Sequence, residues 1–102
     1  MISLFDIRNQ LASGRFEFSR HAFKRAIERN ISDLEIMEAG ENAIIIEEYP
    51  EDKYSPSLLL LGFTQRNRPL HLQVTSTDET LVKIITFYEP DENHWDNSLR
   101  RK

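Results

Sequence analysis

Three side chains suited to phosphodiester chemistry fall on one stripe of a predicted helix. At about 100° per residue, His21, Arg25 and Arg29 lie within about 80° of one another. They lie opposite Phe23 and Ile27, so we expect the stripe to face solvent. A histidine transfers protons near neutral pH, and a guanidinium group binds phosphate through paired N–H donors. The stripe therefore predicts a site that binds a phosphate and acts on it.

The same stripe can also be interpreted as an ordinary solvated helix face. Glu28 would then pair with Lys24, and His21 would only titrate in water. The net charge is −4, but it is unevenly distributed: residues 15–29 carry five basic side chains against two acids, and residues 32–52 carry eight acids and no base. An acidic chain can therefore present a local basic surface, and a polyanion responds to this local potential rather than to the net charge.

A second histidine lies in a predicted strand. In residues 70–75 apolar and polar side chains alternate, and His71 belongs to the polar set. If this strand pairs with the one at residues 81–88, His71 would lie near Thr86 or Tyr88 at one end of the sheet. The sequence does not fix that register. The alternative is that His71 is a surface residue without a special role.

Together these residues would suit cleavage of RNA without a metal. Such cleavage needs a base for the 2′-hydroxyl, an acid for the leaving oxygen and cations around the phosphorane. We expect His21 and His71 to share the proton transfers, and Tyr88 to donate a hydrogen bond or to stack. The expected RNA-binding residues are Arg25, Arg29 and Thr86.

Patterns for other chemistries are missing from the sequence. His21, His71 and His94 are far apart, there is no HExxH pair, and there are no cysteines. There is no Gly-rich phosphate loop and no G-x-S-x-G motif. We therefore expect neither a metal nor a cofactor. Trp95 is expected to form a hydrophobic latch rather than an active pair with His94.

The elements that must position these residues are helices first and strands afterwards. Apolar spacing predicts a helix over residues 3–12, and residues 15–19 alternate like a short strand. Ser19 can cap a second helix that ends near Asn30, and Ser32 with Glu35 predicts a capping box for a third helix that ends at Gly40. The expected buried side chains of these two helices are Ala22, Phe23, Ala26 and Ile27, then Leu34, Ile36 and Met37. Four strands are predicted at residues 43–49, 57–64, 70–75 and 81–88.

The short polar connections between these strands favour an antiparallel meander. The expected fold is α+β, a single domain over residues 1–102 with N-terminal helices packed on one antiparallel sheet of about four strands. An apolar fraction of 39% with 29% charged residues is typical of a globular chain rather than a disordered one. The longest apolar run, residues 58–63, is too short to cross a bilayer, and the N-terminus does not read as a signal peptide. The lack of cysteine suits a reducing compartment, so we expect a cytoplasmic protein.

The order of several short motifs resembles a bacterial family of domains of unknown function. Residues 18–32 read FSRHAFKRAIERNIS and contain the pattern Ser-x-His-Ala-x-x-Arg. Further matching pieces follow in order: Ile45–Pro50, Leu60–Gly62, Arg68–His71 and Ile85–Pro90, with Trp95 beyond them. The resemblance covers residues 15–96, and the fold of this family is similar to that of the RelE and BrnT ribonuclease toxins.

This resemblance implies the toxin of a toxin–antitoxin pair, with endoribonuclease activity on RNA that is free or on the ribosome. The motif positions are matched by His21, Arg25, His71, Thr86 and Tyr88. The expected partners are RNA and an antitoxin protein, and no membrane. One alternative is a non-catalytic protein-binding module that holds a partner on the helix stripe and the sheet rim, with the acidic residues 47–52 docking a basic antitoxin or another subunit. The other is a domain with a purely structural role.

Overall fold

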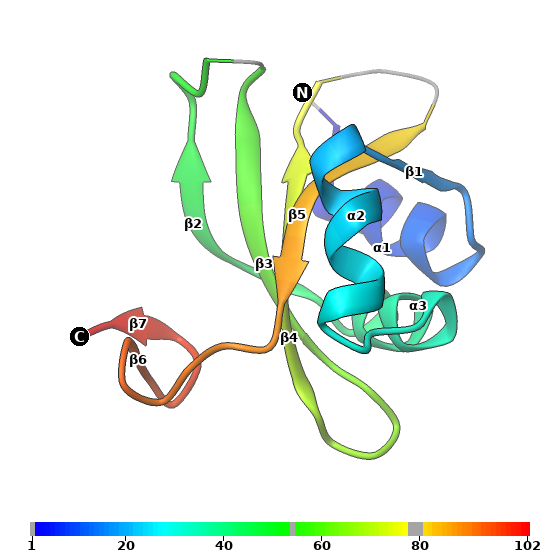
Figure 1. The fold of residues 1–102 in the computed structure, drawn as a ribbon. Coiled ribbons are helices and arrows are strands. Elements are labelled where there is room, and N and C mark those ends of the chain that lie inside the picture. The colour runs from blue at the N-terminus through cyan, green and yellow to red at the C-terminus, as the bar shows by residue number, and fades with distance from the viewer. Residues whose placement is uncertain (1, 54, 78–80) are drawn as a thin grey trace.

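The computed structural model describes residues 2–53, 55–77 and 81–102, which form an α+β fold (Figure 1). The helices are α1 (Leu4–Ala12), α2 (Arg20–Glu28) and α3 (Asp33–Glu41). The strands are β1 (Phe16–Phe18), β2 (Ile44–Tyr49), β3 (Ser57–Phe63), β4 (Pro69–Thr75), β5 (Val82–Tyr88), β6 (Trp95–Asp96) and β7 (Arg100–Arg101). The predicted helices and the four long strands are confirmed to within about two residues. None of the helices in the described ranges is long and apolar enough to cross a bilayer.

The main sheet is mixed rather than purely antiparallel. Its strand order is β1-β5-β4-β3-β2, and the pairs from β5 to β2 are antiparallel as predicted. β1 adds a fifth strand and runs parallel to β5, with Phe16 opposite Val82 and Phe18 opposite Ile84. The prediction of about four antiparallel strands is therefore wrong. Alternation in a three-residue segment identifies a strand, but it gives no information about a partner so far along the chain.

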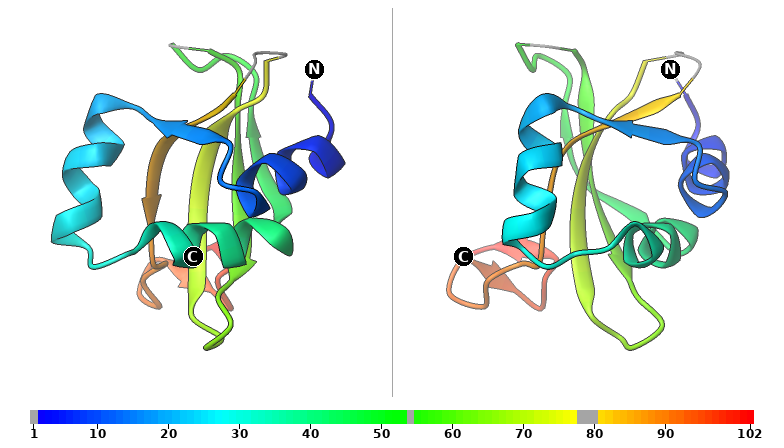
Figure 2. Two further views of the ribbon diagram at one scale, coloured as in Figure 1. Left: turned by 90° about the vertical axis from the view of Figure 1, so that its right-hand side faces the viewer. Right: turned by 45° about the vertical axis from the view of Figure 1, so that its right-hand side comes forward.

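Helices α1 and α3 cover one face of the sheet, and α2 stands apart from them beside β5 (Figure 2). Two glycines allow the close packing on the covered face. A side chain on Gly40 would clash with Leu11 of α1, and one on Gly62 would clash with the Ala39 backbone of α3. The sequence predicted that Gly40 ends α3. The structure shows instead that Gly40 lies within α3 and allows α1 and α3 to pack closely together. The core beneath includes Ile7, Leu11, Ile36, Leu58, Leu60, Leu72, Val74, Val82, Ile84 and Phe87.

The orientation of α2 differs from the sequence prediction. Ala22 is buried and Ala26 packs against the core, but Phe23 and Ile27 remain 64% and 83% exposed. The predicted buried stripe is therefore wrong for its two large members, and Leu34 of α3 is likewise exposed. The small alanine side chains face the body of the domain, and they allow α2 to lie close to β5.

Contacts at both ends fix α2 in place. At its start, Ser19 Oγ accepts the Ala22 N–H at 3.1 Å and donates to the Ile85 carbonyl at 2.8 Å, so one hydroxyl caps the helix and attaches it to β5. At its end, Arg68 donates to the Asn30 carbonyl at 3.0 Å and pairs with Glu35 at 2.9 Å. The predicted capping box of Ser32 and Glu35 is also confirmed.

The C-terminal hairpin of β6 and β7 lies on the other side of the sheet from α1 and α3 (Figures 1 and 2). Trp95 is only 6% exposed and lies against His71 with ring centroids 4.4 Å apart. Arg101 lies over the Trp95 ring at 4.7 Å and pairs with Glu47 at 3.0 Å. Trp95 thus forms the hydrophobic latch that the sequence predicted.

Candidate functional site: a basic cleft beside helix α2

A cleft of about 850 Å³ lies between the start of α2 and the sheet face that α1 and α3 leave uncovered. Its helix wall comes from Ser19, Arg20, His21 and Lys24. Its sheet wall comes from Lys83, Ile85 and Thr86 of β5, with Thr75 of β4 and Ser55 from the connection between β2 and β3. Most of the described lining residues come from the β1–α2 junction and from β5, so these two segments build the larger part of the site.

The lining of this cleft is basic. Arg20, Lys24 and Lys83 contribute three cations, and the described lining residues include no carboxylate. Lys83 has an acidic neighbour in Glu17, whose carboxylate lies 4.0 Å from the Lys83 ammonium, and both side chains are about half exposed. The N-terminus of α2 adds the partial positive charge of its first backbone N–H groups. The cleft therefore attracts anions although the whole chain is acidic.

Hydroxyl groups and one apolar side chain complete the lining. Thr75 Oγ1 accepts the Lys83 N–H at 3.3 Å, which joins the two strands just beyond the shift in their register at Gln73 and Val74. Thr86 Oγ1 lies 3.5 Å from the Arg29 guanidinium. Ile85 gives the cleft an apolar patch on which part of an organic ligand can rest. The cleft thus combines a basic lining with an apolar surface.

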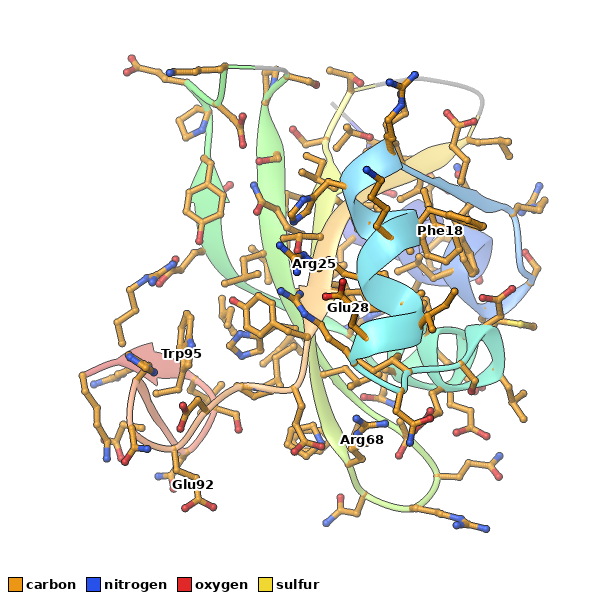
Figure 3. The ribbon with its side chains drawn as sticks, in the orientation of Figure 1. Phe18, Arg25, Glu28, Arg68, Glu92 and Trp95 are labelled. Atoms are coloured by element: carbon orange, nitrogen blue, oxygen red, sulfur yellow. The ribbon has the colours of Figure 1, made fainter. Side chains whose placement is uncertain are left out.

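Of the predicted site residues, His21 and Thr86 line the cleft, and His21 is exposed. Arg25 and Arg29 do not line it. Arg25 instead pairs with Glu28 at 2.7 Å on the surface of α2 (Figure 3). The solvated-face alternative also placed Glu28 in an ion pair, but with Lys24 as the basic partner. Arg29 donates to the Phe87 carbonyl at 2.6 Å and lies 5.9 Å from the centre of the Tyr88 ring, so it ties the end of α2 to β5.

His71 lies on the same sheet face but outside the cleft, in a closed environment. It is 0% exposed, and its Nε2 lies 2.7 Å from the Ser98 carbonyl oxygen, which can only accept a hydrogen bond. Nε2 therefore carries the proton, and Nδ1 accepts from the Tyr88 hydroxyl at 3.3 Å. Burial lowers the pKa of His71 below its ordinary value and raises the pKa of Tyr88. A neutral imidazole with both nitrogens bonded is suited to holding the C-terminal hairpin in place.

The structure thus confirms the predicted proximity of His71 and Tyr88 but keeps His71 away from the lining that includes His21. It also adds Arg20, Lys24, Lys83 and Thr75, which the sequence analysis did not select. A regular alternation in β5 would put Lys83 and Thr86 on opposite faces, but the β4–β5 register shifts between Gln73 and Val74 and brings both to the cleft. For Arg20 and Lys24 a signal was present, since the basic block on residues 15–29 contains both.

The fold and the site together define an α+β domain with a mixed sheet and a basic cleft at its β1–β5 end. Residues 18–89, more than half of the chain, match the family described as Domain of unknown function (DUF4258). The chain belongs to this family, and the matched part contains every residue that lines the cleft. No curated protein and no solved structure gives a significant match to the chain.

Proposed function

We propose that the protein binds RNA in the basic cleft and cleaves it without a metal, as the toxin of a toxin–antitoxin pair. The observation that carries this proposal is the composition of the cleft: three cations and an exposed histidine meet several hydroxyl groups, with no carboxylate among the described lining residues. Cations arranged around one anionic position stabilise a phosphorane, in which negative charge develops on the phosphoryl oxygens. The resemblance to RelE and BrnT toxins suggests the same activity.

The chemistry assigns one role to each part of the cleft. His21 removes the proton of a 2′-hydroxyl, and the resulting 2′-oxygen attacks the adjacent phosphorus. Lys24, Lys83 and Arg20 bind the phosphoryl oxygens. The bond from phosphorus to the 5′-oxygen breaks, and that oxygen takes a proton from water in the open cleft. The products are a 2′,3′-cyclic phosphate and a 5′-hydroxyl.

This assignment differs from the sequence-based expectation in its second histidine. His71 was expected to share the proton transfers, but it is buried beneath the hairpin with both ring nitrogens bonded. In the proposed mechanism His71 and Tyr88 support the hairpin, and Arg29 holds α2 against β5. Of the two histidines, only His21 then takes part in the reaction, as the base for the 2′-hydroxyl, and water protonates the leaving oxygen.

The test is cleavage of labelled single-stranded RNA by the purified protein in excess EDTA. His21→Ala should lower the cleavage rate by about a hundredfold or more while RNA affinity changes little. Lys24→Gln with Lys83→Gln should instead weaken RNA binding. The matched control is His94→Ala, because the His94 side chain is 76% exposed and lies outside the cleft.

In cells, induced expression of the wild type and of His94→Ala should arrest growth, and His21→Ala should not. Equal cleavage and equal arrest by His21→Ala and His94→Ala would reject the catalytic assignment. A protein that binds no RNA at all would leave the protein-binding module as the better explanation of this domain.

A further inference from the structure

Two large apolar side chains project from the solvent side of α2. Phe23 and Ile27 are 64% and 83% exposed, and they lie one helical turn apart. We refer to this pair as the apolar ridge. An amphipathic helix on a domain surface usually buries its large apolar residues, but α2 turns Ala22 and Ala26 inward and leaves the ridge outside. Adjacent exposed apolar groups of this size are typical of a binding surface.

The apolar ridge adjoins the basic cleft. At about 100° per residue, Arg20 and Lys24 follow Ile27 around the helix within about 60°, on the side away from Phe23. Both cations also line the cleft. A partner that covers the ridge therefore reaches the same two cations that a phosphate in the cleft would use.

We propose that the apolar ridge is the docking site for an acidic amphipathic helix of a protein partner, and that this helix and RNA compete for Arg20 and Lys24. The docking depends only on the apolar ridge and on Arg20 and Lys24 beside it. The competition between the helix and RNA rests on the proposed RNA-binding function. The partner places apolar side chains on Phe23 and Ile27 and carboxylates beside Arg20 and Lys24. One bound helix would thus exclude RNA from the cleft without touching β5.

The positive charge of Arg20 and Lys24 beside the apolar ridge favours an acidic helix as the partner. A helix laid across Phe23 and Ile27 needs an apolar stripe at spacings of three and four residues, and acids beside the stripe complement the two cations. A two-fold pairing of α2 with a second copy of this chain would place the ridge cations of both copies together, because such an interface is self-complementary. That repulsion disfavours the second copy as the occupant.

The test uses a labelled synthetic amphipathic helix of about 18 residues, long enough to hold a helix, with leucines on one stripe and glutamates beside it. A control peptide carries lysine in place of each glutamate. Binding to the full-length protein is measured by fluorescence anisotropy, and sedimentation equilibrium measures self-association. The protein variants are Phe23→Ser with Ile27→Ser, and as matched control Phe5→Ser, since Phe5 is 70% exposed on α1.

We expect the acidic peptide to bind the wild type and Phe5→Ser equally, and the ridge variant at least about tenfold more weakly. The lysine peptide should bind none of them measurably. Circular dichroism of the ridge variant must match that of the wild type, and its RNA affinity should be unchanged because neither residue lines the cleft.

Equal binding of the two peptides, or equal binding to the ridge variant, would overturn the docking site. A dimer of the wild type that the ridge variant loses would do the same, because a second copy would then cover the ridge. If the peptide binds the ridge but RNA does not bind the protein, the docking site stands and the proposed function fails. If RNA binds but the bound peptide does not displace it, the competition is wrong while the proposed function stands.

Discussion

Two ends of one sheet face carry a histidine each, and they differ in access rather than in residue type. At the α2 end, His21 is exposed in a cleft with Arg20, Lys24 and Lys83 around it. At the hairpin end, His71 is enclosed by Trp95, Tyr88 and the Ser98 carbonyl. The first arrangement leaves cations available to a ligand, and the second uses every polar atom of the ring for internal contacts.

The charges follow the same division. At the hairpin end Arg101 contacts Glu47, the Tyr49 hydroxyl and the Trp95 ring, so its charge is compensated within the fold. At the α2 end the cleft lining brings three cations together without a carboxylate among the described residues. Like charges that lie close together repel one another and destabilise the folded chain. Such clusters are nevertheless common in sites that bind a ligand of opposite charge. The hairpin end therefore contributes to stability, whereas the α2 end presents its positive charge to solvent.

The largest expected effect separates the two histidines by stability. His71→Ala removes two hydrogen bonds and a packed ring from a fully buried position, which should lower the free energy of unfolding by about 3 kcal/mol. His21→Ala should change it by less than about 0.5 kcal/mol, because the side chain is exposed. Urea denaturation followed by circular dichroism measures both. Similar losses in the free energy of unfolding for the two variants would show that His71 does not stabilise the fold more than His21 does.

A somewhat smaller effect is expected from the cover of His71. Trp95→Ala should cost about 2 kcal/mol, less than a core tryptophan, because the two short strands of the hairpin can detach while the main sheet persists. Hydrogen exchange should then accelerate in β6 and β7 and remain slow in β3 and β4. Leu99→Ala on the same hairpin is the control, since Leu99 is exposed and should have little effect. Uniform acceleration over the whole chain would show that the hairpin does not open separately.

A further prediction concerns the pH dependence of the free energy of unfolding. Burial lowers the pKa of His71 in the folded protein below its ordinary value of 6.5, so the unfolded chain takes up the proton first as the pH falls. The contribution of His71 to stability is therefore complete above pH 6.5 and declines as the pH falls below it. The carboxylates with lowered pKa, Glu35 and Glu47, lose their contribution only below their ordinary value of 4.5.

The measurement is the free energy of unfolding of the wild type and of His71→Asn between pH 7.5 and pH 5, a range set by the ordinary histidine pKa of about 6.5. The wild type should lose stability over this interval, and the variant should lose less. Glu47 and Arg101 are the charged groups nearest to His71, and they act in opposite directions on its pKa. Parallel curves for the two proteins would indicate that His71 is accessible to protons in the folded state.

The smallest expected effect concerns one cation of the cleft. Lys83→Gln should leave stability nearly unchanged and reduce the salt dependence of RNA binding, with the slope of log K against log salt falling by about 0.7 for single-stranded RNA. Arg66→Gln, in the loop between β3 and β4, is a control for the loss of a charge outside the cleft. An identical slope for both variants would place the phosphate contacts elsewhere.

The local elements could be predicted from the sequence because their signals are local. Ser19, and Ser32 with Glu35, mark helix starts through contacts within three residues, and alternation in β4 puts His71 opposite the core. The parallel β1–β5 pair could not be predicted in this way, because its two strands are separated by most of the chain. The orientation of α2 was also missed, because apolar periodicity does not distinguish a helix that packs through alanines from one that packs through Phe23 and Ile27.

Part of the candidate site could be predicted from the sequence. His21 and the surrounding basic block were selected by type and spacing, and His21 lines the cleft. His71 was selected by type, but the Ser98 and Trp95 contacts that enclose it come from a hairpin that no local pattern connects to β4. Lys83 lies opposite the buried Val82 and Ile84, as regular alternation places it, but no local pattern shows that this face of β5 adjoins α2. The register shift after Ile84 turns Thr86 to the same face, which alternation does not predict. Access and register depend on tertiary structure, and these two properties account for the differences.

The attachment of α2 to β5 has a consequence for the order of events during synthesis. The two walls of the cleft come from residues 19–24 and 83–86, and the hydrogen bond from Ser19 to Ile85 joins positions that leave the ribosome at very different times. A contact between such distant parts of the chain forms late, because the intervening loop must close first. The cleft therefore cannot assemble before residues 83–86 have left the ribosome. Until then the basic residues of α2 lack the sheet wall that completes the cleft.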